Sequence, residues 1–375
     1  MKPRETVTSS QMAFLAIAFS IGSSIVYIPS PLEQAAGNAA WLSLAASFGF
    51  GLLVLSCVLY LNRTHPGQSM VECCRSLLGP APAAVAAVFL IAMLFFALPA
   101  IVAGIGDFQT SIVMKETPDY VFNSFSFLAV VLTVRAGILV MARMFLLLVV
   151  VMLLFSFTVI LLALPLYRPE YLLPLLPGGM KPLLHGTFIA SGFPFGEIAL
   201  FTMLMPYAAN SESAKLNRRL YAAYSATGVT LLLSAVCSTM TFGPAAGEVQ
   251  FALFRISYEI QIGELFQRME AIIGIALILG SYMKACLFLF ILNRTAVELL
   301  RLRDDKALLF PLSFVCLLLS LTMFRNPADF NHQVYVIWPF IVLSTGCTLV
   351  FLLSALAWLS RRTRSFPNGR SENAP

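Results

Sequence analysis

Two ionisable side chains lie inside long apolar stretches of this sequence, where an isolated charge is unfavourable. They are Glu197 and Lys284. Ionisable groups at membrane depth tend to pair with one another and to serve a substrate, an ion or a proton. We expect Glu197 to face a cavity, where it orders water or contacts an ammonium group; capping of a broken helix is the alternative. Lys284, whose nearest carboxylate within an apolar stretch is Glu197, is expected to take the place of a coupling cation. The alternative is that the Lys284 side chain snorkels, extending along the helix toward the membrane surface near Arg294.

Two short segments, Gly22–Ser24 and Ser191–Glu197, combine residues that interrupt helices. Glycine permits backbone conformations that other residues avoid, and proline removes a backbone donor. Lipid offers no partners to free backbone groups, so a broken helix survives only where it lines a cavity. Free N–H groups can bind a carboxylate and free carbonyls an ammonium group, which suits a zwitterionic amino acid. Close helix packing is the alternative role of these glycines. The predicted ligand-binding residues are Gly22, Ser23, Ser24, Gly192, Phe193, Pro194, Phe195, Gly196 and Glu197, with Lys284 as the mimic of a coupling cation.

Signatures of soluble enzymes are absent from the sequence. We find no Walker loop, no dinucleotide-binding glycine motif, no nucleophile elbow and no box of metal ligands. The three histidines, His65, His185 and His332, are scattered along the chain. We therefore predict no enzymatic activity, no catalytic residue, no cofactor and no metal. The net charge of +6 is spread over loops without interleaved aromatic residues, so we expect no nucleic-acid partner.

The composition predicts that membrane helices position these residues. Of 375 residues, 59% are hydrophobic and 11% charged, against about 45–50% and about 25% in soluble domains. The mean hydropathy is +0.86. A spanning helix needs about 20 apolar residues, and the sequence contains ten apolar runs of about this length. They are Gln11–Leu32, Ala39–Leu61, Pro82–Ile105, Tyr120–Ala142, Phe145–Leu164, Leu184–Tyr207, Tyr221–Phe242, Ala271–Asn293, Ala307–Phe324 and Val334–Leu359.

The ten runs predict an all-α integral membrane protein with two related halves. Both termini then lie on one side, and most of the 24 lysine and arginine residues fall in loops on that side, which the positive-inside rule identifies as the cytoplasm. The interrupted first and sixth runs are five spans apart, so the second half has inverted orientation. Paired interruptions in inverted halves indicate a binding site at the membrane midplane of a secondary transporter. The expected parts are a cytoplasmic segment 1–9, a membrane domain 10–360 with repeats 10–164 and 184–359, and a cytoplasmic tail 361–375.

Two further features concern the surfaces of the membrane. The loop Gly243–Arg268 is amphipathic, and we expect short helices lying on the outer face. The basic tail is expected to contact anionic membrane lipid. Trp338 and Trp358, near span ends, are expected to anchor at the interface between membrane and water.

Several segments resemble the spore germination permease family, whose members are the membrane-embedded B subunits of nutrient germinant receptors. The resemblance covers about residues 5–360. It rests on Gly178–Gly186, Phe193–Glu197, Leu204–Tyr207, Arg135–Ile138 with Arg143, Arg255–Glu270, Lys284 and Thr8–Met12. It implies the fold of amino acid–polyamine–organocation transporters, a LeuT-like five-plus-five inverted repeat with helices 1 and 6 broken. It also implies residence in the inner membrane of a bacterial spore and two partners, a larger A subunit and a C-subunit lipoprotein.

The predicted function is therefore that of a receptor subunit. It would bind a small germinant, expected to be an amino acid, in a midplane pocket between spans one, six and eight, and trigger germination. A proton-coupled amino-acid transporter that uses the same site is the alternative. A passive conduit for ions or water, lined by Glu197 and Lys284, is a third class.

Overall fold

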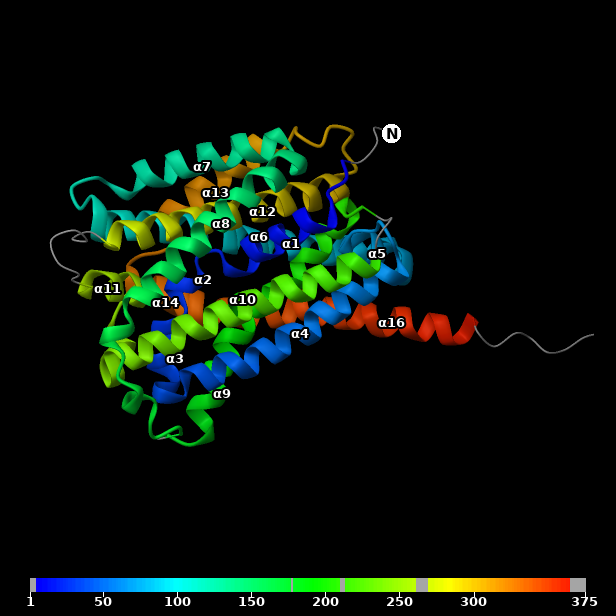
Figure 1. Ribbon diagram of the computed structural model, residues 1–375. Helices are drawn as coiled ribbons and strands as arrows, with labels where there is room; N and C mark the ends of the chain where they lie inside the picture. Colours follow the sequence, from blue (N-terminus) through cyan, green and yellow to red (C-terminus); the bar gives the residue numbers. More distant parts are fainter. Residues whose placement is uncertain (1–4, 177, 210–212, 261–268, 365–375) are drawn as a thin grey trace, which may run out of the picture.

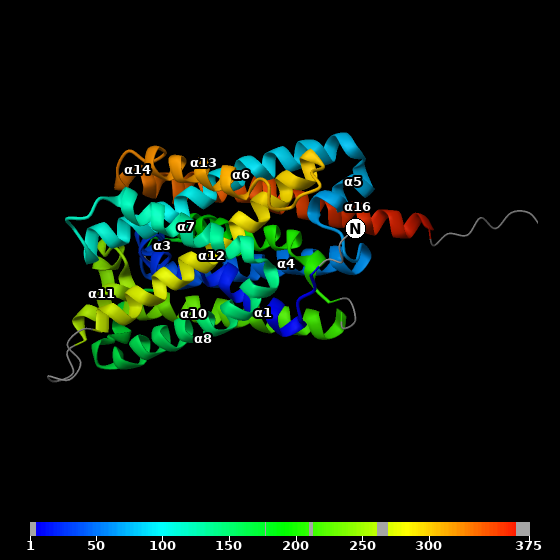
Figure 2. The same ribbon diagram turned by 90° about the horizontal axis from the view of Figure 1, so that it is seen from above.

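The computed structural model describes residues 5–176, 178–209, 213–260 and 269–364, and their regular structure is helical apart from one isolated β-bridge between Val7 and Ala208. The α-helices are α1 (Ser9–Ile21), α2 (Ser24–Tyr27), α3 (Pro29–Ala36), α4 (Ala40–Thr64), α5 (Met70–Leu78), α6 (Pro80–Phe108), α7 (Asp119–Ala136), α8 (Ile138–Leu162), α9 (Met180–Ala190), α10 (Ser213–Phe242), α11 (Ala252–Glu259), α12 (Met269–Leu300), α13 (Leu309–Thr322), α14 (Pro327–His332), α15 (Trp338–Ile341) and α16 (Thr348–Arg364). The 3-10 and π segments are η1 (Gly37–Ala39), η2 (Gln109–Val113), η3 (Leu164–Leu166), η4 (Pro169–Leu172), η5 (Ser191–Phe195), η6 (Gly196–Met203), η7 (Met205–Tyr207), η9 (Gly243–Glu248), η10 (Gln333–Ile337) and η11 (Val342–Cys347). The long helices lie side by side in one bundle (Figures 1 and 2).

Seven helices in the described residues are long and apolar enough to cross a membrane. They correspond to predicted spans one, two, three, five, seven, eight and ten. The other three predicted spans correspond to α7, to the interrupted segment that begins with α9, and to α13 with its 14 residues. An all-α membrane bundle is thus confirmed, whereas the count of ten spanning helices is not.

The start of α1 and the end of α16 lie at the same end of the bundle, together with α5 (Figures 1 and 2). There Val7 donates its N–H to the carbonyl of Tyr207, and the N–H of Ala209 donates to the carbonyl of Val7. Val7, just before α1, is thereby tied to the end of the sixth predicted span. Residues 1–4, residues 261–268 of the predicted outer loop and residues 365–375 of the predicted tail lie outside the described residues.

The first predicted span is interrupted at Gly22, as the sequence indicates. Gly22 has φ +39° and ψ −125°, a conformation that ends α1 and that residues with a Cβ rarely adopt. The chain then continues through α2 and α3. A Cβ on Gly280 of α12 would overlap the carbonyl oxygen of Gly22, so the interrupted backbone lies directly against α12.

The sixth predicted span is interrupted between α9 and η6. Phe193 has an extended backbone (φ −125°, ψ 117°), and the peptide bond between Phe193 and Pro194 is cis. Gly192 packs so closely on α15 that an added Cβ would overlap Pro339. Both predicted helix breaks are therefore present, and each lies against another element of the bundle.

The turn between the fourth and fifth predicted spans differs from the sequence prediction. We expected the fourth span to continue to Ala142, but α7 ends at Ala136 and Gly137, with φ +101°, starts α8 directly. The N–H of Leu139 donates to the carboxylate of Glu5 at 3.4 Å. A carboxylate stabilises the positive end of the helix dipole, so Glu5 favours the earlier start of α8.

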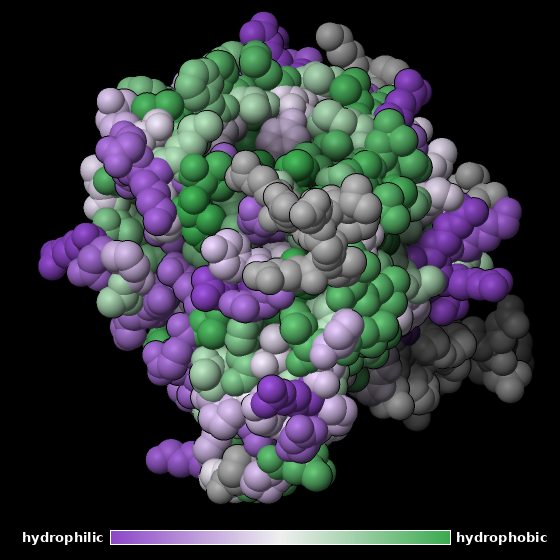
Figure 3. All heavy atoms as spheres, turned by 60° about the vertical axis from the view of Figure 1, so that its left-hand side comes forward, coloured by the Kyte–Doolittle hydropathy of each residue, from purple (hydrophilic) through white to green (hydrophobic). Residues whose placement is uncertain are grey.

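The outer surface fits a membrane protein. Large apolar side chains on the flanks of the bundle are exposed, including Phe125 (67%), Leu147 (65%) and Leu53 (62%). Hydrophilic residues are interspersed with apolar ones on the end that carries α11 (Figure 3). The amphipathic loop that begins at Gly243 contains the short helices that the sequence predicts, η9 and α11. Ser30 of α3 donates a hydrogen bond to the carbonyl of Gly247 in η9.

Candidate functional site

Lys284 and Glu197 form an ion pair in the centre of the bundle. Lys284 lies on α12 with no exposed surface, Glu197 lies on η6 with 2% exposed, and Lys284 Nζ is 2.5 Å from Glu197 Oε2. The stem of Lys284 passes along the first helix break, since a Cβ on Gly22 would lie 2.6 Å from Lys284 Cδ. The side chain thus joins α12 to both interrupted segments, and snorkelling to the surface is excluded.

The other oxygen of the Glu197 carboxylate also has a partner. Trp338 of α15 donates its indole N–H to Glu197 Oε1 at 2.8 Å. The Lys284 ammonium lies 4.5 Å from the ring centroid of Phe193 and 5.6 Å from that of Phe288. Aromatic faces attract cations, and a buried ion pair is tolerated only when its remaining hydrogen-bonding capacity is satisfied. The two charges therefore neutralise each other, and both oxygens of Glu197 have a donor.

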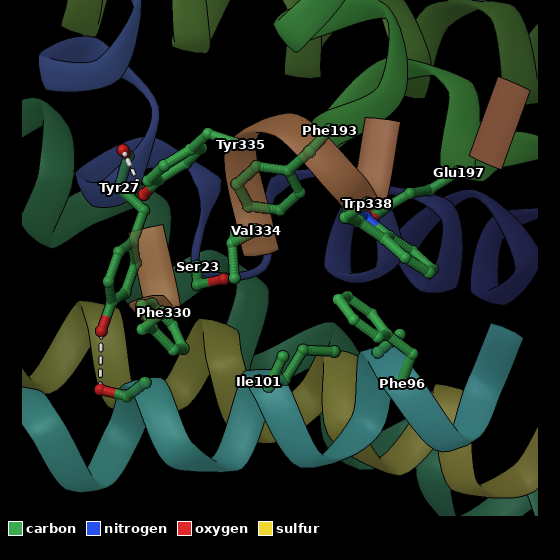
Figure 4. A pocket seen from close by; sticks show the side chains of 13 residues that line it. Ser23, Tyr27, Phe96, Ile101, Phe193, Glu197, Phe330, Val334, Tyr335 and Trp338 are labelled. Carbon is green, nitrogen blue, oxygen red and sulfur yellow. Dashed lines mark hydrogen bonds between the residues drawn. The ribbon is translucent and has the colours of Figure 1, made fainter. Parts of the chain in front are cut away.

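A small cavity of about 40 Å³ opens beside this pair. Figure 4 shows Phe96 and Ile101 on α6 facing it from one side and Phe193, Glu197 and Trp338 from the other. Its lining residues come from α2 and the segment before it, α6, η5, η6, α14, η10 and α15. They are Ser23, Tyr27, Phe96, Ala97, Ala100, Ile101, Gly104, Phe193, Glu197, Phe330, Val334, Tyr335 and Trp338.

Two tyrosines connect the walls at the part of the cavity farthest from Glu197 (Figure 4). The hydroxyl of Tyr27 donates to the carbonyl of Gly104 at 2.6 Å, and the hydroxyl of Tyr335 donates to the carbonyl of Tyr27 at 3.2 Å. The ring of Tyr27 also meets the edge of Phe251, the residue before α11. These bonds tie α2 to α6 and η10.

The structure divides the predicted site residues into two groups. Ser23, Phe193 and Glu197 line the cavity. The others are buried behind it. Gly22 packs on Lys284, Gly192 packs on Pro339, and Ser24 and Pro194 are buried in the two interrupted segments. The carbonyl of Phe195 accepts a hydrogen bond from Tyr224, and the carbonyl of Gly196 accepts one from the Cys347 thiol. This second group fixes the shape of the breaks.

Sequence reasoning missed the aromatic walls that α6, α14, η10 and α15 contribute. Trp338, expected at the membrane interface, is 4% exposed and stacks on Phe96 with ring centroids 5.8 Å apart and an angle of 8° between the planes. That expectation was wrong because proximity to a span end does not show which way a side chain faces. Pro339, directly after Trp338, is the only local signal of irregular backbone there.

A second buried carboxylate, Glu33 on α3, also went unnoticed in the sequence. It is 6% exposed and accepts hydrogen bonds from the hydroxyls of Ser238 (3.0 Å) and Thr239 (2.8 Å) on α10. These bonds hold α3 against α10. Within the part of the chain that the structure describes, Glu33 therefore has a bridging role away from the cavity.

Comparisons with known proteins agree with this architecture. A model of the family described as "Spore germination protein" matches residues 6–328. Spore germination protein KB of Bacillus subtilis (strain 168) is 24% identical over 365 residues, which are 95% of this chain and 96% of that protein.

Solved transporters share the fold. The crystal structure of MhsT in complex with L-phenylalanine superposes with a TM-score of 0.69 at 14% identity and covers 95% of this chain and 89% of its own. The manganese transporter of Eremococcus coleocola, solved with an aromatic bis-isothiourea compound, has a TM-score of 0.60 at 13% identity, with 95% of this chain and 76% of its own covered. These likenesses confirm the predicted LeuT-like fold.

Proposed function

The chain belongs to the spore germination protein family, and from that membership we propose that it is the membrane-embedded subunit of a nutrient-germinant receptor. Its family and fold are of the transporter or receptor type, and its apolar helices make it an integral membrane protein. In the proposed function the cavity binds a small germinant, an amino acid, and binding triggers germination. The observation that carries the proposal is that one cavity touches both helix breaks, at Ser23 and at Phe193.

The two breaks supply the polar groups for the ends of a zwitterion. In this proposal the ligand carboxylate meets the N–H group of Ser23 and the ligand ammonium meets the carbonyl of Phe193, because these residues of the two breaks line the cavity. Free backbone groups at interrupted membrane helices serve substrates in this way. Glu197, whose two oxygens are already engaged, orients Trp338 at the cavity wall and is not the main partner of the ammonium.

Lys284 has a separate role in the proposal. Its fixed ammonium lies between the first break, the sixth span and α12, where a transporter of this kind would bind a coupling cation. Ligand binding is then independent of sodium. If the Lys284 ammonium gives up its proton during the working cycle, the same pair couples binding to protons, as the alternative function of a proton-coupled amino-acid transporter requires.

A receptor of this type works by shifting a conformational equilibrium. Moving the population from 1:99 to 99:1 requires a ligand that binds one state more tightly by about 5.5 kcal/mol. In the proposal, the hydrogen bonds of Tyr27 and Tyr335 break when the cavity opens and so supply part of that difference. The partners in the proposal are an A subunit and a C-subunit lipoprotein, and the location is the inner membrane of a spore with both termini in the cytoplasm.

Binding and flux measured on one preparation separate the two functions. The full-length chain is reconstituted in liposomes and supplied with radiolabelled leucine, with and without an imposed proton gradient. We expect saturable binding, and no accumulation above that of empty liposomes, because a receptor need not complete a transport cycle. Accumulation that follows the proton gradient would establish the transporter instead. Absence of both binding and accumulation would contradict both functions.

A further inference from the structure

The one charged group in the cavity wall, the Glu197 carboxylate, is already paired with the Lys284 ammonium. Of the thirteen described residues that line it, Glu197 is the one acidic residue, and none is lysine or arginine. Both Glu197 oxygens accept hydrogen bonds, from Lys284 Nζ and Trp338 Nε1. A ligand side chain that carries an ammonium, guanidinium or carboxylate group would lose its hydration without gaining an opposite charge, which is strongly unfavourable.

The hydroxyl groups of the cavity are largely engaged as well. Tyr27 donates its hydroxyl hydrogen to the carbonyl of Gly104, and Tyr335 donates its own to the carbonyl of Tyr27. A sugar or another polyol needs a partner for each hydroxyl group, because a buried polar group without one is destabilising. The lining therefore disfavours polyols as well as charged side chains.

Flat aromatic faces form the remaining walls. Phe96 and Trp338 are stacked on each other, and Phe193, whose ring covers the Lys284 ammonium, lies across the cavity from α6 (Figure 4). Phe330 and Val334 complete the lining toward Tyr27. Such walls gain contact area with a branched aliphatic or aromatic side chain and favour offset or edge contacts with a ring.

We propose that the ligand is an amino acid with an uncharged apolar side chain, branched aliphatic or aromatic, and that Phe96 and Trp338 determine this specificity. The inference rests on the proposed function, since it concerns the side chain of the amino acid that the breaks would hold. Phe96 lies on α6, outside both helix breaks, so its replacement leaves the polar groups for the zwitterion in place.

Thermal stabilisation of the purified full-length chain tests the inference with five probes: leucine, phenylalanine, lysine, glutamate and glucose. We expect leucine and phenylalanine to raise the melting temperature in a saturable way, and the other three to leave it unchanged, because a ligand stabilises only the state that binds it. In Phe96→Ala the affinity for leucine and phenylalanine should fall about 10–100-fold. Phe89→Ala, a matched change on the exposed side of α6, should leave it unchanged.

The outcomes separate the inference from the function on which it rests. Lysine or glutamate that binds as tightly as leucine, or an unchanged affinity in Phe96→Ala, would overturn the inference while the binding of an amino acid stands. Stabilisation by glucose alone, or by none of the probes, would overturn the proposed function as well. Phe96→Leu, which keeps most of the apolar volume, guards against a folding defect: its melting temperature without ligand should match that of the parent, and its loss of phenylalanine affinity should be smaller.

Discussion

The variant Lys284→Met is expected to lose about 3–5 kcal/mol of stability, because it leaves the buried carboxylate of Glu197 with Trp338 as its one remaining hydrogen-bond donor among the described residues. Methionine keeps most of the apolar stem that packs on Gly22, so the loss reports on the charge and not on a cavity. The measurement is the thermal unfolding of the purified chain in detergent. Lys181→Met removes an exposed lysine and should have no effect.

The double variant Lys284→Met/Glu197→Gln turns this expectation into a sharper test. Removing both charges leaves no unpaired ion, and neutral replacement of a buried pair is often close to neutral in stability. We therefore expect the double variant to be more stable than Lys284→Met or Glu197→Gln alone, which a double-mutant cycle records as a coupling free energy. Additive losses in the double variant would show that the two side chains do not form the buried pair.

Gly192→Ala is expected to have the second large effect. A Cβ at this position overlaps the backbone of Pro339, so relief requires a movement of main chain and not of a flexible side chain. Overpacking of this kind typically lowers the free energy of unfolding by about 1–3 kcal/mol. Because the clash is with main-chain atoms, we expect a loss at the upper end of this range. Because Pro339 follows Trp338, the wall of the cavity should shift as well. The unfolding temperature and leucine binding should both fall.

A matched substitution separates this clash from the general effect of adding a methyl group. Gly346 is buried, as Gly192 is, but the nearest atoms to an added Cβ, on Ala199 and Met93, are at 3.6 Å. Gly346→Ala should therefore keep both stability and binding. Equal behaviour of the two alanine variants would show that the packing of the sixth span on α15 does not shape the site.

The parts of the site that the sequence predicts are those with local causes. Gly22 and Pro194 interrupt helices through their own backbone chemistry, so both breaks were predictable. The position of a charge among apolar residues likewise singled out Glu197 and Lys284, and the tendency of such groups to pair suggested that they meet.

The aromatic walls have no such local cause. Phe96 and Trp338 lie in apolar runs that would look the same whichever way the side chains faced, and only the packing of α6 against α15 turns them toward the cavity. The start of α8 was misplaced although Gly137, with φ +101°, is a local signal of the turn. The contact of Leu139 with Glu5, far apart in sequence, adds a cause that no local pattern reveals.

A leucine titration monitored by Trp338 fluorescence tests the central claim most directly. The chain has three tryptophans, so Trp41→Phe/Trp358→Phe leaves Trp338 at the cavity wall as the one reporter. If a germinant amino acid binds between the two helix breaks and Lys284 replaces the coupling cation, the signal should change saturably, with the same midpoint in sodium chloride and in choline chloride. A signal that stays constant at all leucine concentrations, or that changes only when sodium is present, would contradict the account.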